Sequence, residues 1–217
     1  MKIDTITRMA DEANGEEGYW ARMKHYHAET NTVHQGIVKG LLAMASSRSK
    51  KSLKNESILD LGAGRLGSTG RFFSSSRILY TDKMENLPES IFYAKKVLDF
   101  NDTNFLLSTL IETKAKAITS LFAVDCHLSH SKKEQLWKDA FLTSKHLDVI
   151  VTSGFYLEGL QENETVDVPC VGSVYQSSGS RFYSEDVFTE YQIHCPVPSA
   201  MFGEDVVEVW RIMERVG

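Results

Sequence analysis

Cysteines are few in this chain, and they lie far apart. Cys126, Cys170 and Cys195 are the three cysteines among 217 residues, and no two of them form a C-x-x-C pair. Disulfide frameworks and structural zinc sites depend on more numerous or more closely spaced cysteines. We therefore expect neither, and we expect a reducing, intracellular and cytoplasmic location.

Long hydrophobic runs are also missing. Apolar stretches such as residues 147–157 are interrupted by polar residues and fall short of the roughly 20 residues that a membrane-spanning helix needs. No long apolar segment follows the basic residue at the N-terminus, so a secretory signal is not expected. The sequence thus predicts a protein with no membrane partner.

Two close pairs of histidines lack the context of a metal site. His25 and His27, and again His127 and His130, have spacings that metal ligands can use. Zinc sites combine three or four ligands in recognisable motifs, and neither pair belongs to one. We expect no bound metal.

The chain has little excess charge, and its balance is acidic. The net charge is −5, and 42% of the residues are hydrophobic, as in an ordinary globular domain. This acidity argues against a protein that coats nucleic acid without specificity. Residues 30–55, however, contain five lysine and arginine residues and no acid. This segment is either a solvated basic linker or a patch that receives phosphates, and charge alone does not decide between them.

Helix-like and strand-like segments alternate along most of the chain, which predicts an α/β fold with crossover helices. Helices are expected over residues 19–45 (with a break near 30–32), 68–73, 103–113 and 132–144, and a short helix and loop over 86–95. Strands are expected at 57–61, 77–81, 96–98, 117–124 and 148–153, and hairpin pieces at 171–176, 181–184, 191–196 and 205–213. The Ser- and Lys-rich residues 46–57 have the composition of a connector.

The most informative stretch is a glycine-rich loop that follows an expected strand and precedes an expected helix. Gly62, Gly64 and Gly67 have G-x-G-x-x-G spacing, which lets backbone amides approach a ligand closely. Asp82 ends the next strand about 20 residues later, where an acid can accept hydrogen bonds from ribose hydroxyls. The loop therefore predicts a nucleotide-type ligand.

The position of Asp60 bears on which nucleotide is bound. A carboxylate two residues before the first glycine would lie where the pyrophosphate of a dinucleotide passes. The same negative charge suits the ammonium group of S-adenosylmethionine, which also carries a positive sulfonium. We therefore favour S-adenosylmethionine over a dinucleotide.

The D-x-G-x-G string, with acids ending the second and third strands, resembles the class I S-adenosylmethionine-dependent methyltransferases over residues 57–157. The resemblance implies a Rossmann-like fold with a seven-stranded, mostly parallel sheet, an antiparallel last strand and S-adenosylhomocysteine as product. It also implies that Asp82 binds ribose and that Asp99 receives the adenine amino group. The expected cofactor-binding residues are Lys39, Asp60, Gly62, Ala63, Gly64, Asp82, Lys83, Asp99, Phe100 and Phe122.

The resemblance divides the chain into an N-terminal helical extension with the basic linker, residues 1–56, and a Rossmann-like domain, residues 57–217. A hairpin insertion is expected at about residues 165–190.

Methyl transfer depends mainly on holding the reacting atoms in line, so the sequence says less about the acceptor. A ring nitrogen with a lone pair needs no base, whereas a hydroxyl usually does. There is no Asn-Pro-Pro-aromatic string, which would suggest methylation of an amino group. There is also no clear Lys-Asp-Lys-Glu arrangement of the type that ribose 2′-O-methyltransferases use. Asp125 remains open as a base.

Three short stretches resemble the mRNA cap guanine-N7 methyltransferases. They are residues 35–42 around Lys39, residues 120–129 around His127, and residues 189–194 around Glu190. This resemblance implies capped RNA, or a GTP-like cap, as acceptor, with Glu190 receiving the base edge. The expected acceptor-binding residues are His127, Tyr156, Glu190 and Tyr191.

Two alternatives stay open for the function. One is a methyltransferase with a small-molecule acceptor, and the other is a catalytically inactive methyltransferase-like subunit. The sequence does not indicate the oligomeric state.

Overall fold

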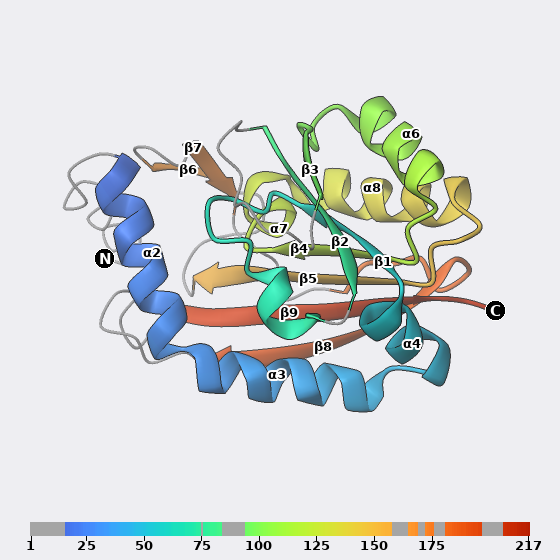
Figure 1. Ribbon diagram of the computed structural model, residues 1–217, viewed down its shortest axis with the longest axis horizontal. Helices are drawn as coiled ribbons and strands as arrows, with labels where there is room; N and C mark the ends of the chain where they lie inside the picture. Colours follow the sequence, from blue (N-terminus) through green and yellow to red (C-terminus); the bar gives the residue numbers. More distant parts are fainter. Residues whose placement is uncertain are drawn as a thin grey trace.

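The computed structural model (Figure 1) describes residues 16–74, 76–83, 94–157, 165–168, 172–175, 181–196 and 206–217. Its main feature is a seven-stranded sheet in the order β3-β2-β1-β4-β5-β9-β8. The strands are β1 (Ser57–Leu61), β2 (Arg77–Asp82), β3 (Ala94–Val97), β4 (Ala117–Leu121), β5 (Val149–Leu157), β8 (Phe188–Pro196) and β9 (Val206–Arg215).

The directions of the strands complete the topology. Strands β1 to β5 are parallel to one another, whereas β9 runs antiparallel to both β5 and β8. This order, with one antiparallel strand next to the edge, is the Rossmann-like fold of the class I methyltransferases. The predicted fold class is therefore confirmed.

Helices cover both faces of the sheet, with α3 and α4 on one side and α6 and α8 on the other (Figure 1). The helices are α2 (Glu16–Glu29), α3 (Asn31–Met44), α4 (Ser47–Asn55), α5 (Thr69–Phe72), α6 (Thr103–Thr113), α7 (Val124–His127) and α8 (His130–Thr143). Successive strand residues alternate between the two cores. Ile58 packs on the α3 and α4 side, and Leu59 packs on the α6 and α8 side.

The prediction of a connector over residues 46–57 is wrong, because most of this segment is helix α4. Ser46 caps the helix by accepting a hydrogen bond from the Ser49 backbone amide at 3.2 Å. Leu53 is fully buried, and the Ser52 hydroxyl donates to Asp148 at 2.7 Å. One buried leucine and two buried serines hold the helix against the sheet, a pattern too polar to be recognised from composition.

The expected boundaries shift at several other elements. Strand β4 ends at Leu121 because α7 begins at Val124, and β5 continues to Leu157 because it pairs with β9 along its whole length. Strand β3 begins at Ala94, inside the expected helix and loop over 86–95, whose first eight residues lie outside the described part.

The region after β5 contains a separate antiparallel pair, β6 (Thr165–Val168) and β7 (Gly172–Tyr175). Both strands fall within the expected hairpin insertion at about residues 165–190. The expected strand at 181–184 is irregular, and the piece expected at 191–196 is the second part of the longer β8.

Candidate cofactor and acceptor site

The glycine loop follows β1 at the carboxyl edge of the parallel strands. Gly62, Gly64 and Gly67 have φ angles of +69°, +56° and +52°, which glycine adopts without strain. A Cβ on Gly62 would lie 2.3 Å from the Cβ of Ala123, so the loop and the end of β4 approach as closely as backbones can. The Ala63 amide donates to the Thr81 carbonyl at 3.0 Å and fixes the loop beside β2. The loop is thus a cradle held in place by β2 and by the end of β4, and its binding of a nucleotide-type ligand stays a prediction.

Asp82 lies against this loop. Its carboxylate is buried, and its Oδ2 accepts a hydrogen bond from the Gly64 amide at 2.9 Å. The acid expected to bind ribose is therefore beside the glycines, although ribose binding itself stays a prediction. Lys83 follows it as an exposed residue.

Asp60 lies beneath the glycine loop and is bonded to two neighbouring elements. Its Oδ1 accepts hydrogen bonds from the hydroxyls of Thr69 and Thr119, each at 2.8 Å. Burial raises the pKa of Asp60 to about 7, against these two hydrogen bonds. The side chain joins β1, α5 and β4 beneath the loop, a structural role that the motif alone does not reveal.

The residues expected at the adenine lie after β3. The Oδ1 of exposed Asp99 accepts hydrogen bonds from the Asn101 backbone and side-chain nitrogens at 2.9 and 2.8 Å. The Phe100 ring lies 3.4 Å from a Cβ position on Gly62 and is stacked near His127, with 6.3 Å between ring centroids. His127, expected at the acceptor, therefore lies beside Phe100, expected at the cofactor.

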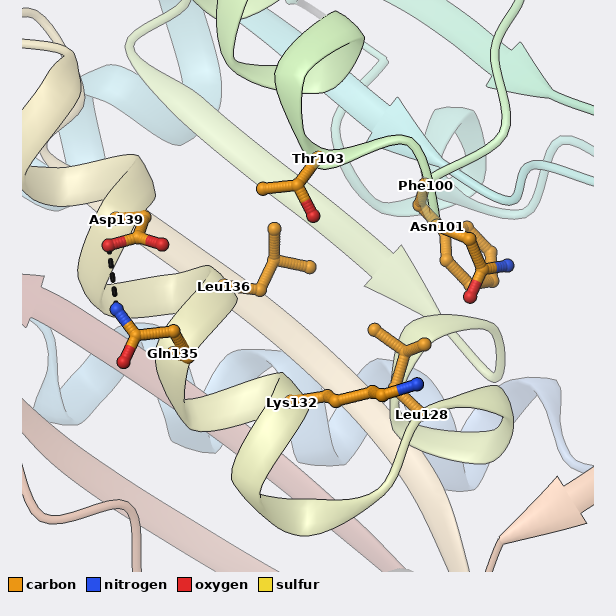
Figure 2. A pocket seen from close by; sticks show the side chains of 8 residues that line it. All are labelled: Phe100, Asn101, Thr103, Leu128, Lys132, Gln135, Leu136 and Asp139. Carbon is orange, nitrogen blue, oxygen red and sulfur yellow. Dashed lines mark hydrogen bonds between the residues drawn. The ribbon is translucent and has the colours of Figure 1, made fainter.

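A cavity of about 240 Å³ opens next to these residues, between the N-terminus of α6 and helix α8. Figure 2 shows Phe100 and Asn101 on one side of it, with Lys132 crossing toward Leu128. The other lining residues are Thr103, Gln135, Leu136 and Asp139. The cavity extends the space near Phe100 with a mixed polar and apolar wall.

Helix α2 runs along the edge of the sheet toward which β5 points (Figure 1). Its Trp20 lies over the glycine loop, since a Cβ on Gly64 would be 2.7 Å from the Trp20 indole. No role of this helix in the site could be predicted from its sequence. It nevertheless covers the edge at which the predicted cofactor site lies.

A buried polar cluster, formed by Tyr26, His34, Glu208 and Trp210, lies at the same edge. The His34 Nε2 is 3.0 Å from Oε1 and 2.9 Å from Oε2 of Glu208. The Trp210 indole donates to Oε2 at 2.7 Å, and the Tyr26 hydroxyl donates to Oε1. Tyr26, His34, Glu208 and Trp210 are all fully buried, so side chains from three elements converge on the carboxyl group of Glu208.

Burial governs the protonation of this cluster. It raises the pKa of Glu208 to about 8, against the Trp210 hydrogen bond. Burial, and next the charge of Arg71, lower the pKa of His34 to about 4. Burial therefore favours the neutral forms of both Glu208 and His34.

Phe122 connects the cluster with the glycine loop. Its φ is +57°, and its amide donates to the carbonyl and the hydroxyl of Ser153 at 3.0 and 3.1 Å. The centroid of its ring lies 4.7 Å from the ring centroid of Phe155, 5.6 Å from that of Trp210 and 5.9 Å from that of His34. Phe122, which we expected to cover adenine, thus belongs to an aromatic group around the buried cluster.

Glu190 is on the opposite face of the sheet. Its Oε2 accepts from the Phe182 amide at 2.6 Å, and its Oε1 accepts from Gln192 at 2.6 Å and pairs with Arg211 at 3.1 Å. Both carboxylate oxygens are therefore engaged within the chain. Burial raises the pKa of Glu190, with Gln192 and Arg211 acting against it.

The remaining acceptor candidates are dispersed. Tyr191 packs on the α3 side, away from Glu190, and half-buried Tyr156 pairs with Val207. The structure does not gather the four residues expected at the acceptor into one pocket. Lys39 is exposed on α3, whereas His34 on the buried face of that helix reaches Phe122.

Asp125, left open as a base, is fully buried and pairs with Arg211 at 2.6 Å while accepting from Thr152 at 3.0 Å. The sequence patterns did not point to Trp20, Tyr26, His34 and Glu208 at this edge of the sheet. One signal existed: Glu208 interrupts an otherwise apolar strand pattern, Val206-Val207-Glu208-Val209-Trp210, and a charge in such a pattern is expensive unless it is used.

No protein-family model matches the chain, and no curated protein matches its sequence. Solved structures do match. A 1,6-didemethyltoxoflavin N1-methyltransferase from Burkholderia thailandensis, with its acceptor and S-adenosylhomocysteine bound, is 13% identical, with a TM-score of 0.54 over 91% of this chain and 86% of that one.

Two further structures are similar. DhpI in complex with S-adenosylhomocysteine is 11% identical, with a TM-score of 0.50 over 99% of this chain and 97% of that one. A cyclopropane-fatty-acyl-phospholipid synthase-like protein from Lactobacillus casei is 9% identical, with a TM-score of 0.52 over 82% of this chain and 90% of that one. At these identities the likenesses show the class I methyltransferase fold.

Within the described residues, no three or more His, Cys, Asp or Glu side chains gather as a metal site would need. None of the helices in that part of the chain is long and apolar enough to cross a membrane.

Proposed function

We propose that this chain is an S-adenosylmethionine-dependent methyltransferase with a small-molecule acceptor. The observation that carries the proposal is the cradle at the carboxyl edge of β1, where Gly62 and Gly64 have positive φ and the Gly64 amide bonds Asp82. The residues present fit the cofactor, because a side chain at Gly62 would fill the space between the loop and Ala123.

In this proposal each residue of the cradle has a positioning role. The loop amides and Asp82 hold the nucleoside, with Asp82 accepting from the ribose hydroxyls. Asp99 and Phe100 border the adenine, and Asp60 keeps β1, α5 and β4 together beneath the loop. The bound cofactor supplies an electrophilic methyl group on a sulfonium, and the chain contributes alignment and exclusion of water.

A small acceptor is supported by the structures that share the fold. The structure of the similar Burkholderia enzyme contains 1,6-didemethyltoxoflavin and S-adenosylhomocysteine. Here, Trp20 of α2 lies against Gly64, and the aromatic group around Phe122 lies at the same edge of the sheet. An apolar edge covered by a helix suits a small molecule better than a charged polymer.

Methylation of the guanine N7 of an RNA cap would require Glu190 to accept hydrogen bonds from the edge of the guanine base. Both oxygens of Glu190 already accept hydrogen bonds or pair with Arg211, and the residue lies on the face opposite Trp210 and Glu208. Its burial is explained without a bound base. We therefore favour the small-molecule acceptor over capped RNA.

The test is methyl transfer from tritiated S-adenosylmethionine to four separate pools: a metabolite extract, capped RNA, uncapped RNA and protein. We expect label in the metabolite pool and none in the RNA pools. Label confined to capped RNA would reinstate the cap function. Cofactor binding without transfer to any pool would instead favour an inactive methyltransferase-like subunit.

A further inference from the structure

We propose that the amino edge of the sheet, where the parallel strands begin, is a docking surface for an anionic lipid bilayer. This edge lies opposite the cofactor cradle and combines lysine side chains with exposed apolar side chains at the ends of two helices. The proposal does not depend on the methyltransferase chemistry, and it assigns a partner to a surface that the proposed function leaves unused.

The segments that precede the parallel strands lie side by side at this edge. The Lys116 amide donates to the Ser57 carbonyl at 2.9 Å, and the Asp148 amide donates to the Lys116 carbonyl at 2.9 Å. On the other side of β1, the Arg77 amide donates to the carbonyl of half-buried Glu56 at 3.2 Å. Neighbouring strands are only about 4.8 Å apart, so these segments form one surface. In Figure 1 this surface is the end of the molecule with α4 and the C-terminus, opposite α2.

Helices α6 and α8 end at this edge with the same order of side chains. The last turn of α6 carries Ile111, which is 53% exposed, and the last turn of α8 carries Leu142, which is 62% exposed. An exposed lysine follows three residues later in each case, Lys114 after α6 and Lys145 after α8. Both helices pack on the same face of the sheet. Two exposed apolar side chains, each followed by a lysine, therefore lie at one end of the molecule.

The cations of the amino edge are left without neutralising acids. Five of them have no ion pair with any residue that the structure describes: Lys51, Arg77, Lys114, Lys116 and Lys145. The acids nearby serve other cations, since Asp148 pairs with Arg48 and Glu112 lies 3.5 Å from the Lys96 Nζ. The exposed acids at residues 185–186 lie before β8, two strands beyond β5 in the sheet. The surface from α4 to the start of β5 is therefore positively charged in a chain whose net charge is −5.

Lys114 occupies a position where glycine would be less strained. It ends α6 in the left-handed conformation, with φ of +48° and ψ of +38°. Residues with a Cβ adopt this conformation at a cost, and helices that end in this way usually do so on glycine. The chain keeps a lysine here against its backbone preference, which indicates a use for the side chain.

The composition of the surface favours a bilayer over a protein or an RNA. Protein interfaces are enriched in aromatic residues and arginine and depleted in lysine, and single-stranded RNA is bound by stacking on aromatic rings. At the amino edge, lysine supplies four of the five cations that have no ion pair among the described residues, and the exposed side chains at the two helix ends are aliphatic. Lysines are attracted to anionic lipids as point charges, and aliphatic side chains can enter the interfacial layer.

The orientation that follows is compatible with the cofactor site. The sequence predicts no membrane partner because it lacks a spanning segment, and a contact at the bilayer surface needs none. With the amino edge on the bilayer, the glycine loop and Trp20 at the carboxyl edge face away from it. The cofactor and the acceptor then enter from the aqueous phase.

The test is co-sedimentation of the full chain with vesicles of phosphatidylcholine alone, and of phosphatidylcholine with about 30% phosphatidylglycerol. We expect binding to the anionic vesicles and little to the neutral ones. Most of the binding should be lost in about 1 M salt, where the Debye length is about 3 Å.

Two pairs of substitutions that remove the same charge are then compared. Lys114→Gln with Lys145→Gln should weaken binding to the anionic vesicles about 25-fold, about fivefold for each lysine. Lys24→Gln with Lys132→Gln removes two exposed lysines at the opposite edge and should bind like the wild type. Both pairs should keep the wild-type affinity for S-adenosylhomocysteine.

Two further variants separate a docking surface from a general attraction of charge. Ile111→Ser with Leu142→Ser leaves the net charge unchanged and should weaken binding to the anionic vesicles at least about fivefold. Lys114→Gly should raise the Tm by about 2 to 4 °C and still weaken vesicle binding about fivefold. A lysine kept for stability would not give this combination.

The proposal is overturned if the wild type binds both kinds of vesicle equally or binds neither, or if the two lysine pairs have the same effect. It is also overturned if the Lys114 and Lys145 variant loses binding to an RNA oligonucleotide and not to vesicles, because the surface would then receive nucleic acid. Failure to bind S-adenosylhomocysteine, measured separately, would overturn the proposed function and leave this proposal standing.

Discussion

Among single residues, the two aspartates near the glycine loop have different surroundings and therefore different expected behaviour. Asp82 accepts a hydrogen bond from the Gly64 amide of the loop, whereas Asp60 accepts from two threonine hydroxyls beneath the loop. In the proposed function Asp82 binds the ribose, and Asp60 holds the loop against its neighbouring elements. Their contributions can be separated, because one should act on affinity and the other on stability.

Asp60→Asn should change how stability depends on pH. The pKa of Asp60 rises on folding from 3.8 to about 7, so the folded protein binds more protons than the unfolded chain between these values. The stabilising effect of the protonated carboxyl is fully present below the unfolded pKa and is lost as pH rises through the folded one.

The wild type should therefore lose stability relative to Asp60→Asn as the pH rises from about 4 to about 7. The difference between the two free energies of unfolding should fall by at most about 1.4 kcal/mol per pH unit, which amounts to a few kcal/mol over the whole range. Urea denaturation across this range measures it. Two curves that stay parallel would show that the pKa of Asp60 is not raised.

Gly62→Ala should destabilise the chain, and Gly36→Ala should not. At Gly62 the φ of +69° and the 2.3 Å approach to Ala123 together predict a loss of at least about 2 kcal/mol. Gly36 lies inside α3 with nothing within 4 Å of its Cβ position, so alanine there should stabilise by about 0.5 to 1 kcal/mol. Opposite signs in thermal or urea unfolding are the expected result, and equal effects would contradict the cradle geometry.

At the level of helices and strands, the elements with a clear apolar period could be predicted, and the others depended on tertiary contacts. Helix α6 begins and ends at the predicted residues 103 and 113, and the strand after it starts as expected at Ala117. Helix α4 escaped recognition because one leucine supplies its apolar contact. The end of β5 was missed because its length depends on β9, some 50 residues later in the chain.

The same limit applies to the site. Gly62, Gly64 and Asp82 could be recognised because they lie close in sequence and follow a known spacing. Glu208 and His34 could not, because 174 residues separate two side chains that meet only when α3 packs on the sheet. Residues brought together by folding leave no local pattern.

Leu53→Ala tests the assignment of residues 47–55 as a packed helix. Leu53 is fully buried against the α3 and α4 core, so its truncation should cost about 2 to 5 kcal/mol of unfolding free energy. Leu142→Ala, at a leucine of α8 that is 62% exposed, should change stability by no more than about 0.5 kcal/mol. If chemical denaturation shows equally small effects for both variants, residues 47–55 form a solvated connector and not a packed helix.

For the whole molecule, the fold, the cradle and helix α2 converge on one edge of the sheet. The strand order is that of the class I methyltransferases, and the glycine loop, Asp82 and Trp20 meet at the carboxyl ends of its central strands. A ligand bound at this edge contacts several elements at once. S-adenosylhomocysteine at about 100 times its Kd should therefore raise the unfolding free energy by about 2.7 kcal/mol, visible as an upward shift in Tm.

Isothermal titration of the full chain with S-adenosylhomocysteine, and separately with NAD, tests the cofactor assignment most directly. We predict binding of S-adenosylhomocysteine and none of NAD. Asp82→Ala should weaken that binding by about 1.5 to 3 kcal/mol, while the exposed Asp186→Ala leaves it unchanged. Binding of NAD without S-adenosylhomocysteine, or an Asp82→Ala variant that binds as tightly as the wild type, would contradict the account.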